Sequence, residues 1–154
     1  MSATLADDDL LIVRTFDAPP ATVFSLWSEE RHFKRWIGPG GFDCPNVEID
    51  FRVGGAYRAM IRSTDDESWF GGVYREIEPS RRLVFTFAWD GGPSAGVETL
   101  VTITFAERDG KTVQTFHQTR FLNAEARDRH IGGWTSCFDK AEAYARQIAE
   151  EQAS

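Results

Sequence analysis

The middle of the chain alternates large apolar residues with small or polar ones, which is the period of two expected of β-strands. The segment 83–89 shows this best, because Leu83, Phe85 and Phe87 share one face. Turns rich in Gly, Pro and Asp separate the segments of this kind, as in an antiparallel meander. The pattern predicts six strands after residue 41, at 42–50, 56–63, 68–77, 83–89, 99–106 and 112–119.

The first part of the chain predicts one strand followed by two short helices. Residues 9–17 have strand character, and a proline pair then ends the strand because proline lacks the amide proton that a ladder needs. A short apolar face that ends at Trp27 predicts a helix over 21–27. Ser28 is the predicted N-cap of a second helix over 29–36.

The last part of the chain predicts a single long helix over 123–150, with Asn123 as its N-cap. Gly132 and Gly133 lie inside it, and each costs about 1 kcal/mol relative to alanine. Close approach to the sheet or a slight bend would offset that cost. Apolar and small residues recur every three or four positions, so one face packs on the sheet; they include Ala126, His130, Trp134, Phe138, Ala141 and Ala145.

This order of elements predicts an α+β fold in which a curved seven-stranded antiparallel sheet grips the C-terminal helix. The length of 154 residues fits one domain, since a domain averages about 150 residues. We expect this domain to span residues 9–150, with loose ends at 1–8 and 151–154. Such a sheet can leave a space between its concave face and the helix.

Composition and charge remove several classes of partner. The chain carries 17 Lys and Arg against 24 Asp and Glu, a net charge of −7, which argues against nucleic acid and anionic membrane surfaces as partners. No apolar run approaches the ~18 residues of a membrane span, and the N-terminus lacks the features of a signal peptide. Cys44 and Cys137 have no zinc or redox spacing, so we expect reduced thiols and a cytoplasmic location.

Several short motifs, in this order along the chain, resemble the START-like (SRPBCC) superfamily and its helix-grip fold. Within it, the chain is similar to the branch of homologues of the heat-shock chaperone ATPase activator, over about residues 9–150. The motifs are Arg14-x-Phe16-x-Ala18-Pro19, Trp36-x-Gly38-Pro39, Asp50-x-Arg52-x-Gly54-Gly55, Gly72 and Tyr74 before Ile77-x-Pro79, and Gly133-Trp134.

The resemblance implies a cavity and a small-molecule ligand. Members of the superfamily bind hydrophobic or amphipathic molecules, and some relatives are cyclases. The eukaryotic activator stimulates its chaperone, but there this domain is part of a longer chain with an extra N-terminal domain. We therefore expect an apolar ligand as the partner, with a chaperone left open.

The candidate cavity residues lie on the aromatic face of the sheet and on the small-residue face of the last helix. Small residues on a helix that covers a large sheet leave room for a ligand, and an apolar cavity with a few polar groups is the default site. The predicted lining residues are Tyr57, Tyr74, Phe85, Phe87, Phe116, Gln118, His130, Trp134, Phe138 and Ala141.

The inward face of strand 112–119 stays open at this point. The family pattern places Gln114, Phe116 and Gln118 inside, whereas periodicity alone could equally choose Val113, Thr115 and His117. The family often has histidine where this chain has Gln118, so a titrating group is missing there, which disfavours acid–base catalysis.

No catalytic residue, metal site or cofactor is predicted. His32, His117 and His130 show no ligand spacing, and no nucleophile–base pair can be defended. The leading hypothesis is a non-catalytic domain that binds a hydrophobic ligand. The alternatives are a cyclase or hydrolase with Tyr74, His130 or Arg58 as proton handler, and a protein-interaction module.

Overall fold

The computed structural model describes residues 9–153, and its order of elements confirms the predicted one. The expectation for residues 1–8 lies outside this range. The elements are β1 (Leu10–Phe16), α1 (Pro20–Ser28), α2 (Glu30–Trp36), β2 (Asp43–Ile49), β3 (Ala56–Arg62), β4 (Glu67–Glu78), β5 (Arg82–Trp89), β6 (Thr99–Arg108), β7 (Lys111–Thr119) and α3 (Ala124–Ala153).

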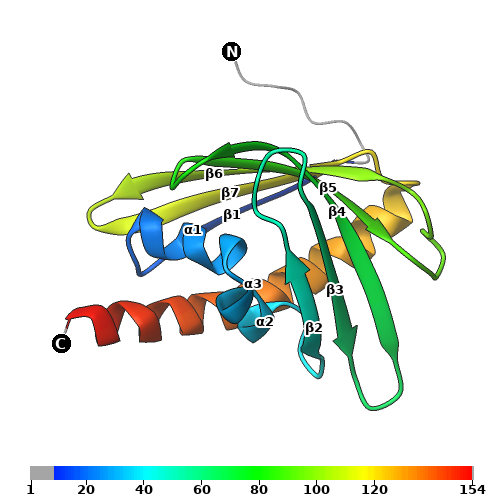
Figure 1. Ribbon diagram of the computed structural model, residues 1–154, viewed down its shortest axis with the longest axis horizontal. Helices are drawn as coiled ribbons and strands as arrows, with labels where there is room; N and C mark the ends of the chain where they lie inside the picture. Colours follow the sequence, from blue (N-terminus) through cyan, green and yellow to red (C-terminus); the bar gives the residue numbers. More distant parts are fainter. Residues whose placement is uncertain (1–8, 154) are drawn as a thin grey trace.

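The seven strands form one antiparallel sheet in the order β1-β7-β6-β5-β4-β3-β2. Strands β2 to β7 follow each other as a meander, and β1 adds to the far edge beside β7. All three helices lie on the same side of the sheet, where α3 crosses it as a long diagonal and α1 and α2 lie beside α3 (Figure 1). This is the predicted α+β helix-grip architecture.

Two details of the helices differ from the prediction. Ser28 is the last residue of α1 and caps nothing, because the extended Glu29 separates the two helices. Helix α3 runs to Ala153, into the end that the sequence predicted to be loose. Its last turns are held in place, since Ile148 is buried and Thr22 of α1 hydrogen-bonds Gln152 at 3.2 Å. The predicted cap at Asn123 is confirmed, with its Oδ1 accepting from the Ala126 amide at 2.8 Å.

The inward face of β7 is the one that the family pattern indicates. Gln114, Phe116 and Gln118 are each at most 1% exposed, whereas the residues between them are only partly covered. Inward-facing glutamines need partners inside the core, and α1 and α3 provide them, as described below.

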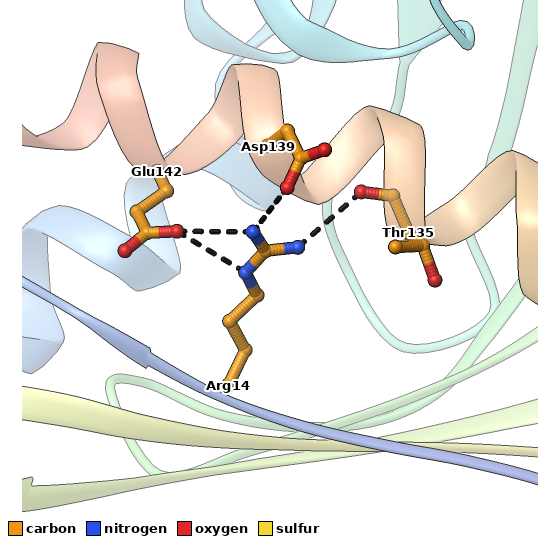
Figure 2. Close-up of polar contacts among 4 residues, drawn as sticks. All are labelled: Arg14, Thr135, Asp139 and Glu142. Atoms are coloured by element: carbon orange, nitrogen blue, oxygen red, sulfur yellow. Dashed lines mark hydrogen bonds and ion pairs between the residues drawn. The ribbon is translucent and has the colours of Figure 1, made fainter.

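The edge strand β1 is tied to the middle of α3 by Arg14 (Figure 2). The guanidinium donates from Nε to Glu142 at 3.2 Å, from Nη1 to the Thr135 carbonyl at 3.3 Å, and from Nη2 to Asp139. These three acceptors share one helical face, because their spacings are four and three residues. One side chain therefore fixes how α3 crosses the sheet at this edge.

The Asp50–Arg52 motif is part of a turn between β2 and β3. Arg52 Nε donates to both carboxylate oxygens of Asp50, at 3.0 and 2.9 Å, and both side chains are exposed. Gly54 follows with φ +86°, a conformation that favours glycine. The motif thus acts in the turn and not in the interior, as the sequence favours.

Two negative findings apply to residues 9–153. No helix there is long and apolar enough to cross a membrane. Within the same residues, no three His, Cys, Asp or Glu side chains gather as metal ligands would.

Candidate ligand pocket

The centre of the interior is filled by Trp27 of α1. Its side chain is 3% exposed, and its Nε1 donates to Gln114 Oε1 at 3.0 Å. Six aromatic rings surround it, with centroids at 4.6–6.4 Å: Phe33, Trp36, Phe85, Phe116, Trp134 and Phe138. Sequence reasoning placed Trp27 on an apolar helix face but missed its central position, because the period of a short helix does not show where the helix lies on the sheet.

Several predicted cavity residues therefore lie in solid core. Phe116, Phe138 and Ala141 are at most 2% exposed and do not line the main pocket, so enlarging Ala141 would overpack the helix–sheet contact. Gln118 is also enclosed, with Oε1 accepting from Trp134 Nε1 at 2.8 Å and Nε2 donating to Thr99 at 2.8 Å.

Three more of the predicted residues border only a small gap. Tyr57, Tyr74 and Phe85 surround a space of about 10 Å³, which is at most the room of one water molecule. The Tyr57 hydroxyl donates to the Thr86 carbonyl at 2.7 Å. Burial raises the pKa of both tyrosines, so both phenols stay neutral and act as core side chains.

One apolar pocket of about 330 Å³, named the main pocket for its aromatic wall, lies along the N-terminal half of α3. Its wall comes from that part of α3, the inner faces of β3, β4 and β5, the α2–β2 loop and the β5–β6 loop. Phe87, His130 and Trp134 are the predicted site residues that line it. The rest of the wall is Ile37, Gly38, Pro39, Phe42, Ile61, Ser68, Phe70, Trp89, Gly91, Gly92, Pro93, Ser94, Arg129, Gly133 and Cys137.

Close approach to the sheet, one of the two roles expected for the helical glycines, is wrong. A Cβ atom at Gly132 or Gly133 would meet no atom within 4 Å, so neither glycine permits a close approach to the sheet. Gly133 borders the pocket, whereas Gly132 is exposed on the helix surface. The absent side chain at Gly133 therefore leaves pocket volume open.

His130 is a structural member of the wall. Trp89 Nε1 donates to its Nε2 at 2.8 Å, so Nδ1 carries the proton and donates to the Ala126 carbonyl at 2.8 Å. Both ring nitrogens are thus engaged, and the neutral tautomer is fixed. Burial lowers the pKa of His130, because the charged form would lose solvation, and protonation would also set Nε2–H against Trp89 Nε1–H.

We expect His130 to make the protein less stable in acid. Its folded-state pKa lies below the ordinary value of 6.5, so below that pH the unfolded chain binds more protons and unfolding is favoured. The free energy of unfolding should therefore fall as the pH is lowered below about 6.5, and His130→Gln should reduce this fall. Denaturant melts at several pH values measure it.

His32 provides the matched comparison for that experiment. Burial lowers its pKa as well, so His32→Gln removes its own contribution and leaves the contribution of His130 in place. An unchanged pH dependence in His130→Gln would show that the Trp89 contact does not hold the ring neutral.

The proposed proton handlers do not share one site. His130 lines the pocket, Tyr74 borders the small gap, and Arg58 is exposed on the opposite face of the sheet. There Arg58 stacks on Trp69 at 4.7 Å and pairs with Asp90. Cys137 lines the pocket too, but burial raises its pKa to about 11, so the thiol is protonated near neutrality.

Comparison with known proteins identifies what the chain is similar to. Residues 17–146 match the family model described as activator of Hsp90 ATPase homolog 1-like protein. No curated protein matches the chain.

Solved structures share the fold over nearly the whole chain. A protein from Chromobacterium violaceum is 27% identical, with TM-score 0.79, over 88% of this chain and 96% of its own. A Nitrosomonas europaea protein is 19% identical, with TM-score 0.81, over 98% and 100%. The AHSA1 protein of Silicibacter pomeroyi is 24% identical, with TM-score 0.77, over 93% and 99%. The last two matches show the fold alone.

Proposed function

The chain belongs to the activator of Hsp90 ATPase homolog 1-like family, and from this premise we propose that it binds a hydrophobic or amphipathic small molecule along the N-terminal half of α3. One observation carries the proposal: an aromatic-lined pocket of about 330 Å³ is present beside an interior that is otherwise closely packed. Ligand pockets begin at about 300 Å³, so a molecule of two or three fused rings would fill this one.

The wall suits an apolar ligand. Phe42, Phe70, Phe87, Trp89 and Trp134 supply aromatic surface, and the polar atoms of Trp89 and Trp134 are already hydrogen-bonded within the protein. A ligand that displaces water from such a surface leaves no polar group of these two side chains unsatisfied, so burial of apolar area drives binding.

A role as a protein-interaction module is the second candidate. The family name supports it, and so do the exposed side chains of Leu11 and Val13, which are 45% and 58% accessible on the edge strand β1. A partner that covered this edge would bury apolar area without using the pocket. The experiment below separates the two roles.

Filling the pocket from Gly133 tests the proposal. Gly133→Leu projects a side chain into the open space, whereas Gly132→Leu makes the same substitution one position away on the exposed surface. We expect the wild type and Gly132→Leu to bind the neutral fluorescent dye Prodan equally, and Gly133→Leu to bind it about tenfold more weakly or worse. Fluorescence titration measures all three.

Both variants should remain folded, because each removes a helical glycine that costs about 1 kcal/mol. Equal dye affinity in Gly133→Leu and Gly132→Leu would place the dye outside this pocket. Failure of the wild-type protein to take up any apolar dye would give the interaction module first place.

A further inference from the structure

The pocket wall contains one charged side chain and one buried hydroxyl. Ser94 Oγ is buried and, among the residues that the structure describes, finds no hydrogen-bond partner. Arg129 is the one charged side chain in the described wall. The Ser94 oxygen has almost no surface open to the pocket, so Arg129 is the polar group of the wall that a ligand can reach.

Arg129 stands at the mouth of the pocket and is only weakly engaged. Its Nη1 donates to Glu125 at 3.2 Å, one helical turn away, and the two side chains are 47% and 82% exposed. Exposed pairs of this kind, one helical turn apart, contribute little to stability. A carboxylate on a ligand could therefore take the guanidinium from Glu125 at little cost and accept two hydrogen bonds from it.

The charge of the wall decides which ligands fit. Aromatic rings alone would also attract a cation, but the positive charge of Arg129 at the mouth repels one. The net charge of −7 repels anions at a distance, yet salt screens that field beyond about 8 Å at physiological ionic strength. A ligand in the pocket lies closer than this to Arg129, whose positive charge is part of the wall itself.

We propose that the natural ligand of this pocket is an amphipathic monoanion, with an apolar ring system among the aromatic side chains and a carboxylate bound by Arg129. This inference rests on the proposed function. It is carried by one weakly paired guanidinium in an aromatic wall whose indole N–H groups already have partners.

The test compares probes of one shape and different charge. Calorimetry measures the affinity of 2-naphthoate, its neutral isostere 2-naphthamide and the cation 2-naphthylmethylammonium. We expect 2-naphthoate to bind about tenfold more tightly than 2-naphthamide, the strength of one charge-assisted hydrogen bond, and the cation to bind most weakly. The preference for the anion should shrink as salt is raised.

Three variants assign the effect to residues. Arg129→Gln should lose the preference for 2-naphthoate and keep the affinity for 2-naphthamide. Arg146→Gln makes the same charge change near the other end of α3 and should keep the preference. Ser94→Ala removes a hydroxyl that has almost no surface open to the pocket and should leave 2-naphthoate binding unchanged.

The outcomes separate this inference from the proposed function. If 2-naphthoate and 2-naphthamide bind equally and Arg129→Gln changes neither, the anion preference is wrong while ligand binding stands. Tightest binding of the cation would overturn it as well. If none of the three probes binds the wild-type protein, the proposed function itself fails.

Discussion

Replacing Trp27 with alanine is expected to cost about 3–5 kcal/mol of folding free energy, the range for truncating a buried tryptophan. The indole is enclosed by six aromatic rings, so its removal leaves a cavity that the surrounding rings cannot close without leaving their own contacts. Removal of the indole also takes away the donor to Gln114 Oε1. The Nε2 of Gln114 already lacks a partner among the described residues, so the whole buried amide would then be unsatisfied. Denaturant melts of the two proteins give the difference.

Trp69 is the matched control for this substitution. It lies on the opposite face of the sheet, is half-buried, and stacks against the exposed Arg58. Trp69→Ala should therefore cost clearly less than Trp27→Ala, since a surface site closes or fills with water. Equal costs for the two tryptophans, or a loss below about 1 kcal/mol at Trp27, would contradict the central position of Trp27 in the core.

Much of the fold could be predicted because its elements differ in hydrophobic period. Alternation in β5 and β6 and the three-and-four spacing in α3 follow from burial of one face, so they can be seen in the sequence. Strand β7 was harder, since Val113 and Phe116 make either face plausible. Its inward glutamines are acceptable in a core only because Trp27 and Trp134 donate to them, and those partners come from distant elements.

The pocket could be predicted only in part, because much of its wall comes from segments that are distant in the sequence. Phe87, His130 and Trp134 lie on regular elements whose inward face the sequence shows, and all three line the wall. The rest of the wall comes largely from the α2–β2 and β5–β6 loops, whose path has no periodic signal. The central space expected beside Phe116 and Phe138 is closed by α1, and nothing local to α1 predicts where that helix lies across the sheet.

Trp134 separates the packed core from the pocket, because its side chain borders both the main pocket and the small gap beside Tyr57. Trp134→Ala is expected to cost about 3–5 kcal/mol, as for other buried tryptophans. The truncation also removes the donor to Gln118 Oε1, which is fully buried. Unlike the void at Trp27, the new space would join the pocket and make it larger.

An apolar ligand should therefore rescue Trp134→Ala more than it stabilises the wild type, because it can occupy the space that the indole leaves. Phe138→Ala is the matched control: its ring is buried in the same helix face but does not line the pocket, so its void stays closed to ligand. Thermal melts with and without Prodan should show a larger rise in melting temperature for Trp134→Ala than for Phe138→Ala. The same small rise in both variants would mean that Trp134 does not border a ligand-accessible space, and the pocket would then be too shallow to hold an apolar molecule.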